Sequence, residues 1–201
     1  VAAGLHKTAD YQKLRRRALN YRNVFDTSVG MVRGRYIDGT WCTPFDADKR
    51  ERYITEGTPR QFTFYVPQDI AGLERLMGGD KHFESALDSL FDKDEYWHGN
   101  EHGHHIAFLY NYTGAPYKTQ QRVRQILSDE YSDGPGGLSG NDDAGQMSAW
   151  YVLAAMGFYP VDPVSVNYQL AAPLFDNVRI RLQQKRTFEI RAYKASPEAA
   201  Y

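Results

Sequence analysis

The sequence predicts a mainly helical chain that ends in a short β-segment. Apolar residues recur at three- and four-residue spacing through most of the chain, which is typical of helices with one buried face. Glycine-rich polar loops at 28–58, 96–105 and 134–145 separate these stretches. Toward the C-terminus, short runs alternate β-forming residues with polar ones, as in strands. Helices followed by strands favour two modules over alternating β-α-β units, and we place them at 1–160 and 161–201.

The first helix is expected from Thr8 to Asp26, and a long connection follows from Ser28 to Tyr53. A loop of this length is unusual in a compact domain unless it is functional. Glu56-Gly57-Thr58-Pro59 opens the next helix, and Pro67 interrupts it. The remaining expected elements are a helix ending at Gly78-Gly79, one capped by Asp80, one over Ile106 to Tyr112, one capped by Thr119, one ending near Gly157, and strands over 164–170, 178–182 and 188–192. Helical hairpins arranged in a ring would bring the glycine-rich loops onto one rim.

The composition excludes several classes of protein. The chain has 201 residues and a formal net charge of −1, which gives no support for electrostatic binding to nucleic acid or a membrane surface. No apolar run approaches the roughly 20 residues of a membrane-spanning helix. Cys42 is the only cysteine, so an internal disulfide is excluded. Because the chain starts at Val1 and enters helical sequence at once, we expect a piece of a longer protein whose missing part carries any targeting signal.

An acidic pair, Asp142-Asp143, stands where a glycine-punctuated loop meets an apolar helix. Asn141 and Asp142 suit a helix cap, because a side-chain oxygen there accepts a free backbone N–H. One carboxylate is enough for a cap. The second can act as a general base on water, bind a metal or hold a sugar. The alternative is that both carboxylates only cap the helix, and their spacing alone favours that alternative.

Glu56 and the tryptophans are weaker candidates. Glu56, just before a helix, is either a general acid with a raised pKa or a solvated residue of the first helical turn. Trp41 and Trp97 lie in polar loops, where a ring face can stack on a sugar. Trp150 lies on an apolar helical stripe, which favours a place in the core.

The segment from His98 to His102 matches the pattern His-x-x-Glu-His of inverted zinc proteases. A zinc site of that kind needs both histidines on one face of a continuous helix, and Gly99 and Asn100 are poor residues inside a helix. The alternative is an oxygen site, in which Asn100, Glu101 and backbone carbonyls hold Ca²⁺. The spacing does not choose between the two metals, so a zinc peptidase is the main rival function.

The order of several short segments gives a more specific signal. These segments are Asp38-Gly39-Thr40-Trp41, Thr55-Glu56-Gly57 with Gln61-Phe62, Val66-Pro67-Gln68-Asp69, Leu87 to Phe91, Gly99-Asn100-Glu101 with His104-His105, Tyr110-Asn111-Tyr112, Gly140 to Tyr151, and Gly157 to Val161. Together they resemble glycoside hydrolase family 92, the calcium-dependent exo-α-mannosidases, over about Asp10 to Leu182. The chain departs from the family pattern at Arg60, Gln68 and His102-Gly103.

The resemblance implies an enzyme that removes terminal α-linked mannose with inversion and binds Ca²⁺ at the sugar. It implies an N-terminal β-sandwich domain and a C-terminal α/α toroid, of which this chain is the last part with the closing β-segment. Its partners would then be mannose-containing glycans, the missing sandwich domain and the rest of the toroid. A periplasmic or extracellular location is expected. The isolated chain should have little or no activity.

The resemblance also implies roles for residues. Glu56 resembles the general acid and Asp143 the general base, with Asp142 or Asn141 supporting it. Glu101 resembles a residue at the calcium, with Asn100 and Asp143 as further metal ligands. The residues assigned to sugar contacts are Trp97, His98, Asn100, Gln61 and Asn141. A non-catalytic carbohydrate-binding module is the second rival function.

Overall fold

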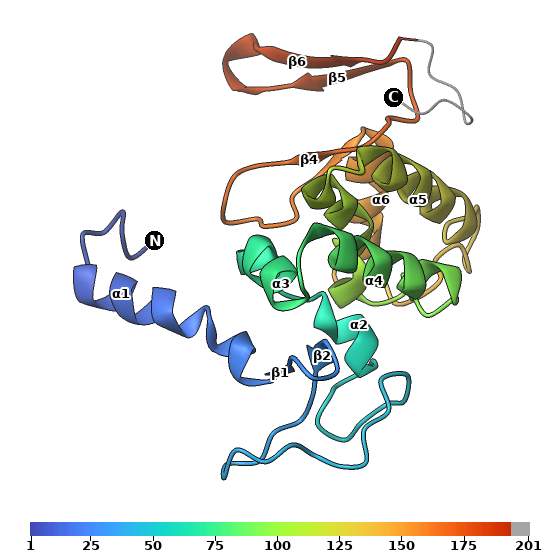
Figure 1. The fold of residues 1–201 in the computed structure, drawn as a ribbon. Coiled ribbons are helices and arrows are strands. Elements are labelled where there is room, and N and C mark those ends of the chain that lie inside the picture. Colours follow the sequence, from blue (N-terminus) through green and yellow to red (C-terminus); the bar gives the residue numbers. More distant parts are fainter. Residues whose placement is uncertain (194–201) are drawn as a thin grey trace. The chain divides into compact units, whose positions relative to one another are not determined.

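A computed structural model describes residues 1–193 and divides the chain into two compact units, Val1–Phe83 and Glu84–Tyr201 (Figure 1). Residues 194–201, the end of the expected β-segment, lie outside the described residues. The described part is mainly helical with short strands, as expected. The boundary expected between residues 160 and 161 stays a prediction. No helix of the described part is long and apolar enough to cross a membrane.

The first unit holds short elements joined by long loops. Its elements are α1 (Thr8–Arg17), a 3₁₀-helix (Asn20–Asn23), β1 (Phe25–Asp26), β2 (Met31–Val32), α2 (Pro59–Thr63), a 3₁₀-helix (Pro67–Asp69) and α3 (Ile70–Leu76). β1 and β2 form an antiparallel hairpin. The long connection before α2 is confirmed, because turns and one isolated bridge, Arg35 to Trp41, fill most of it.

The expected single helix from Thr8 to Asp26 is wrong in its second half. The helix ends at Arg17 and buries none of its residues, and Leu14 on its apolar stripe is 54% exposed. Most helical stability comes from packing an amphipathic face, so periodicity alone does not extend a helix whose residues are not buried. Phe25 is instead buried in the hairpin, where Arg33 forms a 3.0 Å ion pair with Asp26.

The core of the first unit lies where α2, α3 and the start of α4 meet. Phe64 and Phe83 are both buried and contact edge to face, with ring centroids 5.7 Å apart. Leu73 of α3 is fully buried. α3 ends before Gly78 and Gly79, whose φ values of 96° and 95° are left-handed, as expected for a glycine stop signal.

The second unit contains the larger helices and the later strands. Its elements are α4 (Asp80–Asp92, which begins in the first unit), 3₁₀-helices at Glu101–Gly103 and Ile106–Thr113, α5 (Pro116–Asp129), α6 (Gln146–Ala155), β3 (Phe158–Tyr159), β4 (Gln169–Leu170), β5 (Asn177–Arg181), a 3₁₀-helix (Gln183–Lys185) and β6 (Thr187–Arg191). α5 packs against the 3₁₀-helix Ile106–Thr113 and against α6. Trp150 and Phe108 are fully buried at the centre of this unit.

The apolar helix expected over Ile106 to Tyr112 is confirmed as a 3₁₀-helix, Ile106–Thr113, whose first five residues are all buried. The expected start of the next helix needs correction. α5 begins at Pro116 rather than after a Thr119 cap, because proline suits the first helical position and needs no donor there. Thr119 is instead buried within the helix.

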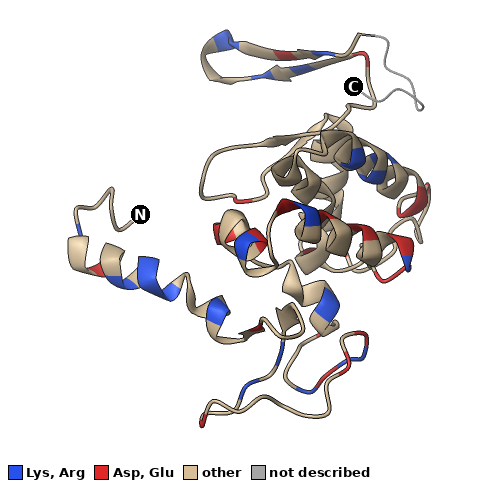
Figure 2. Ribbon diagram, in the orientation of Figure 1, with Lys and Arg blue, Asp and Glu red and all other residues tan. Residues whose placement is uncertain are grey.

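Ion pairs join α4 to α5, where acidic and basic residues face one another (Figure 2). Lys118 binds Glu84 and Asp88, each at 2.6 Å, and Arg122 pairs with Asp92. Partly exposed pairs of this kind contribute about 0–1 kcal/mol each, so they add only modestly to the packing of α4 against α5.

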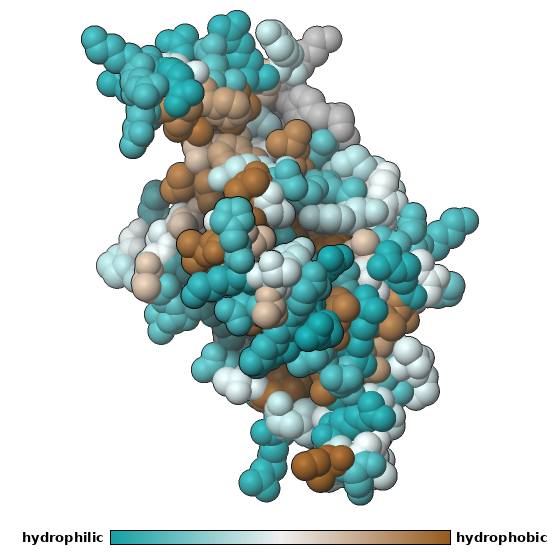
Figure 3. Space-filling model, turned by 90° about the vertical axis from the view of Figure 1, so that its left-hand side faces the viewer, coloured by the Kyte–Doolittle hydropathy of each residue, from teal (hydrophilic) through white to brown (hydrophobic). Residues whose placement is uncertain are grey.

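The strands follow α6 as expected, except for the first. β5 and β6 lie within a residue or two of the expected 178–182 and 188–192 and pair antiparallel. The expected strand over 164–170 is reduced to β4, because Val164 is 84% exposed and Val166 takes a left-handed φ of 57°. Apolar side chains line a groove of about 820 Å³ between α6, β4 and the β5–β6 hairpin (Figure 3).

Candidate active site

The acidic loop gives its two carboxylates different roles at the start of α6. The Asp142 carboxylate accepts hydrogen bonds from the backbone N–H of Ser148 at 2.9 Å and from its hydroxyl at 3.0 Å. The Asp142 carbonyl accepts the Gln146 N–H at 2.7 Å. The N-cap position of α6 is Gly145, so the expectation of an N-cap at Asn141 or Asp142 is wrong in position. The Asp142 carboxylate, three residues upstream of the N-cap, still satisfies a free N–H of the first turn, that of Ser148. The Asp143 carboxylate is left for another partner.

Asp143 lies in an unusual backbone turn. Asp143, Ala144 and Gly145 have successive left-handed φ values of 42°, 58° and 94°. Non-glycine residues in this region cost on the order of 1–3 kcal/mol each and are common at functional sites. Asn141 supports the turn, because its side-chain oxygen accepts the Asp143 N–H at 3.4 Å. The side chain of Asp143 lies at the surface.

The partner of Asp143 is Glu101, which comes from a different loop. A hydrogen bond between the two carboxyl groups raises the pKa of Asp143 above its ordinary value. Burial and the negative charges of Glu101 and Asp142 raise the pKa further. Carboxylates that share a site retain a proton or bind a cation. The structure thus joins the predicted base to a predicted calcium ligand.

Two glycines let the Glu101 loop and the acidic loop cross. A Cβ atom added to Gly140 would overlap the carbonyl oxygen of Gly99, and one added to Gly99 would lie 3.0 Å from the Gly140 Cα. The same added atom would also lie 2.6 Å from the indole nitrogen of Trp97. These glycines are required for the close approach of two backbones.

Gly140→Ala is therefore expected to lower the free energy of unfolding by about 1–3 kcal/mol or more, since the added carbon forces the two loops apart. The matched control is Gly136→Ala in the same loop, where an added carbon meets nothing within 4 Å. The control should change stability by less than about 0.5 kcal/mol. Urea unfolding of the full-length protein measures both. Equal stability of the two variants would contradict the close approach of the Gly99 and Gly140 backbones.

His98, the residue directly before Gly99, is fully buried. Its Nδ1 is 2.7 Å from the Tyr96 hydroxyl oxygen, and its Nε2 is 2.7 Å from the Tyr131 hydroxyl oxygen. Burial, together with the neighbouring His104, lowers the pKa of His98 to about 3, so the ring is neutral at neutral pH. Both ring nitrogens are engaged. The geometry therefore gives no support to the predicted sugar contact of His98.

The zinc alternative needs a helix that this segment does not form. Asn100 has an extended backbone and caps a 3₁₀-helix of three residues, Glu101–Gly103, so His98 precedes the helix that contains His102. Within residues 1–193, no three His, Cys, Asp or Glu side chains form a group suited to a metal ion. The arrangement of His98, Glu101 and His102 on one helical face is absent.

Asn100 and Trp97 flank Glu101. The side-chain oxygen of Asn100 accepts the Glu101 N–H at 2.9 Å, which fixes the backbone that carries Glu101. Trp97 is 38% exposed, and its indole lies against Gly99 at the loop crossing. The roles of both residues toward a sugar remain predictions.

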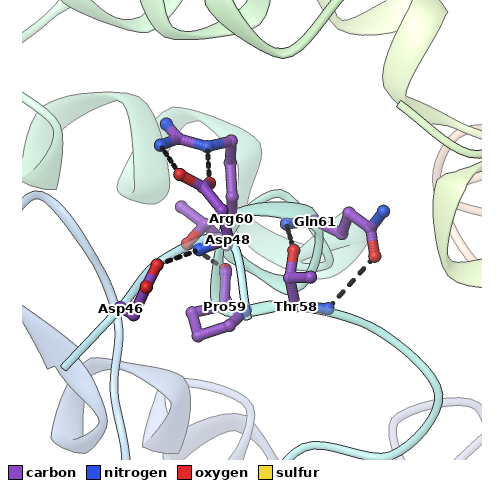
Figure 4. Close-up of polar contacts among 7 residues, drawn as sticks. Asp46, Asp48, Thr58, Pro59, Arg60 and Gln61 are labelled. Carbon is purple, nitrogen blue, oxygen red and sulfur yellow. Dashed lines mark hydrogen bonds and ion pairs between the residues drawn. The ribbon is translucent and has the colours of Figure 1, made fainter. Parts of the chain in front are cut away.

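Glu56 lies in the first unit, directly before α2, with a left-handed φ of 58°. A capping box follows it (Figure 4). The Thr58 hydroxyl oxygen accepts the Gln61 N–H at 3.3 Å, and the Gln61 side-chain oxygen accepts the Thr58 N–H at 3.1 Å. Pro59 occupies the first helical position. The side-chain oxygen of Gln61 therefore holds the start of α2, and its predicted sugar contact remains a prediction.

Arg60 ties the long connection to α2. Its guanidinium binds the Asp48 carboxylate through Nε at 2.5 Å and Nη2 at 3.1 Å (Figure 4). The Arg60 N–H donates to the Ala47 carbonyl at 3.0 Å, and the Asp48 N–H donates to the Asp46 carboxylate at 3.1 Å. This two-point contact gives Arg60, one of the positions where the chain departs from the pattern it resembles, a role in holding the long connection against α2.

The sequence did not single out Tyr131, although it lies at the centre of this region. Its ring stacks on Trp150 with an interplanar angle of 1°, and its hydroxyl donates to the Met147 carbonyl at 3.0 Å. Tyr131 stands alone between α5 and a glycine run, so neither periodicity nor a motif marks it.

The class of protein follows from the comparison with protein families. A helical domain whose loops bring carboxyl groups together is suited to hydrolysis of glycosidic bonds. All residues, 1–201, match the glycosyl hydrolase family 92 catalytic domain, and the chain belongs to this family.

Three relatives define the likeness further. A family GH92 α-mannosidase from Bacteroides thetaiotaomicron is 41% identical with a TM-score of 0.92, covering 100% of this chain and 28% of that chain. A family GH92 inverting mannosidase from the same organism is 32% identical with a TM-score of 0.92, covering 100% of this chain and 30% of that chain. An uncharacterized secreted glycosidase from Arthroderma benhamiae is 31% identical over 206 residues, covering 90% of this chain and 26% of the relative. The chain thus spans less than a third of each.

Proposed function

We propose that this chain provides the acid and the base of an α-mannosidase that inverts configuration and uses Ca²⁺. The observation that carries the proposal is the Glu101–Asp143 carboxyl pair at the loop crossing, in a chain of family 92. Two relatives of high structural similarity are an α-mannosidase and an inverting mannosidase. A zinc peptidase or a non-catalytic sugar-binding module has no comparable support.

Asp143 acts as the general base in this proposal. Its carboxylate lies at the surface while Asp142 is occupied by the first turn of α6. The base removes a proton from water as that water attacks the anomeric carbon of mannose. Asn141 holds the turn that presents Asp143.

Glu56 acts as the general acid. It donates a proton to the glycosidic oxygen as the bond to the leaving group breaks, on the face of the sugar opposite the attacking water. Glu56 is exposed and held at a left-handed φ just before a well-capped helix. Like Asp143, it therefore keeps an unfavourable backbone conformation that presents a carboxylate.

The donor atoms fit a calcium ion. Glu101 and Asp143 bring two carboxyl groups together, and a cation beside them favours the doubly ionised form that the pair otherwise resists. Asn100 adds an amide oxygen of the kind that Ca²⁺ accepts. When bound, Ca²⁺ would hold vicinal sugar hydroxyls and favour a distorted ring.

The remainder of the proposal concerns the larger protein. The helices and rim loops would form the last part of an α/α toroid, completed by other toroid hairpins and an N-terminal β-sandwich domain. The substrates would be glycans that end in α-linked mannose. A periplasmic or extracellular location is proposed, and one curated relative is a secreted glycosidase.

The test is hydrolysis of 4-nitrophenyl α-mannoside and of α-linked mannobioses by the full-length protein. Activity should fall at least about tenfold in a calcium chelator and return with added Ca²⁺, because the carboxyl pair loses its cation. A full-length protein that is folded and releases no mannose from any α-mannoside would contradict the proposal. Full activity after calcium removal would contradict the metal assignment alone.

The isolated chain of 201 residues is the matched comparison. It should release little or no mannose, because it spans less than a third of its relatives. Hydrolysis by the isolated chain at the full-length rate would show that the missing parts are not needed for the site.

A further inference from the structure

A series of hydrogen bonds through the buried ring of His98 connects the loop of Glu101 to the helix that follows Asp143. Tyr131 donates its only hydroxyl proton to the Met147 carbonyl at 3.0 Å. The Tyr131 oxygen must then accept from His98 Nε2, which lies 2.7 Å away. A neutral imidazole has one donor and one acceptor, so His98 Nδ1 accepts from the Tyr96 hydroxyl at 2.7 Å. The Tyr96 hydroxyl also lies 3.4 Å from the Gly103 carbonyl oxygen, and the shorter contact to His98 Nδ1 is the one that completes the series from Tyr96 to Met147.

His104 forms a second connection between the same two segments. Its Nε2 donates to the His98 carbonyl at 3.0 Å, so its Nδ1 accepts from the Gln146 side-chain amide at 3.2 Å. Gln146 is the first residue of α6. The indole N–H of Trp150 donates to the His104 carbonyl at 2.7 Å.

Both connections end in the first turn of α6, which also anchors the acidic loop. Asp142 accepts hydrogen bonds from Gln146 and Ser148 of this turn, and Asp143 follows directly. At the other end, His98 precedes Gly99 and Glu101. These hydrogen bonds therefore link the loop of Glu101 to the turn that carries Asp143. They are partly or fully shielded from water, which strengthens hydrogen bonds and makes a network of them cooperative.

We propose that Tyr131 is a positioning residue for the base, which acts through His98 and the Met147 carbonyl to hold Asp143 in register with Glu101. This inference rests on the proposed α-mannosidase function. Tyr131 contacts no reacting atom in it. A displacement of about 1 Å in a catalytic group lowers turnover by as much as about a hundredfold. Loss of the Tyr131 hydrogen bonds should therefore reduce kcat more than it changes KM.

The test uses Tyr131→Phe in the full-length protein, which keeps the ring and removes only the hydroxyl. We expect kcat for 4-nitrophenyl α-mannoside to fall about tenfold to a hundredfold, with KM within about threefold of wild type. The control is Tyr151→Phe. Tyr151 packs against Tyr131 with centroids 4.9 Å apart, lies partly exposed, and its hydroxyl has no hydrogen bond within residues 1–193. It should keep the wild-type kcat.

A double-mutant cycle separates positioning from general destabilisation. If Tyr131 acts through Asp143, then Tyr131→Phe should lower the residual activity of Asp143→Asn by less than about twofold. The inference would be overturned if Tyr131→Phe lowered kcat as much in the Asp143→Asn variant as in wild type. A wild-type kcat for Tyr131→Phe alone would also overturn it. Tyr96→Phe removes the hydroxyl at the other end of the same series of hydrogen bonds. This variant decides the question if Tyr131→Phe does not fold. A smaller fall in kcat is expected for it, and wild-type kcat would overturn the inference.

Failure of the inference and failure of the proposed function give different results. An inactive wild-type protein contradicts the proposed function. An active wild type that Asp143→Asn inactivates, with Tyr131→Phe fully active, contradicts only the role of Tyr131.

Discussion

Asp143→Asn in the full-length protein is expected to lower kcat for α-mannosides by about 10²- to 10⁴-fold, the usual contribution of a general base. The amide is nearly the same size as the carboxylate and takes no proton from water. Asn also tolerates the left-handed φ of 42° at this position. The loss should be the same for good and poor leaving groups, because the base acts on the attacking water. Steady-state kinetics with aryl α-mannosides of different leaving groups measures it.

Two companion variants sharpen this result. Asp143→Gly suits the same backbone conformation and leaves room for azide, a nucleophile that needs no base, so azide should restore part of the turnover. Asp142→Asn keeps a side-chain oxygen for the Ser148 N–H and should cost much less than Asp143→Asn. If Asp142→Asn is the more damaging change, the two carboxylates have been assigned in the wrong order.

Glu56→Gln is expected to have the second large effect, and its effect should depend on the substrate. Cleavage of an α-mannobiose needs a proton on the leaving oxygen, so its kcat should fall about 10²- to 10⁴-fold. Cleavage of 2,4-dinitrophenyl α-mannoside needs little protonation, because the phenolate is already a stable leaving group, and it should fall far less. The capping box of Thr58 and Gln61 remains intact in this variant, so folding should be unaffected.

The kinetic measurement compares both substrates for Glu56→Gln against wild type. Thr58→Ala is the structural control, since it removes the cap of α2 and should cost about 1 kcal/mol of stability without any dependence on the leaving group. An equal loss of activity on both substrates would show that Glu56 does not donate the proton.

Local signals in the sequence predicted some elements well. Thr58, Pro59 and Gln61 form the capping box within one helical turn, so they mark the start of α2 without any help from the rest of the fold. Gly78 likewise marks the end of α3. The end of α1 at Arg17 was not predictable in this way, because the helical periodicity runs on to Phe25, which is buried in a hairpin instead.

The sequence singled out candidate residues for the site, but it did not show how those residues are arranged in space. Asp143 and Glu101 were recognised from their motifs, and the pairing of their carboxyl groups depends on a loop crossing at Gly99 and Gly140 that no local pattern shows. The sugar contact of His98 stays a prediction, and the sequence did not show that its ring is buried. Its pKa and its two hydrogen bonds arise from packing against segments distant in the chain.

The configuration of the first product tests the central claim most directly. Proton NMR during hydrolysis of an aryl α-mannoside by the full-length protein resolves the two anomers of free mannose before they interconvert. An acid and a base on opposite faces, about 6.5–9.5 Å apart with water between them, predict that β-mannose appears first. α-Mannose as the first product would mean that a covalent intermediate forms, and would contradict the roles of Glu56 and Asp143.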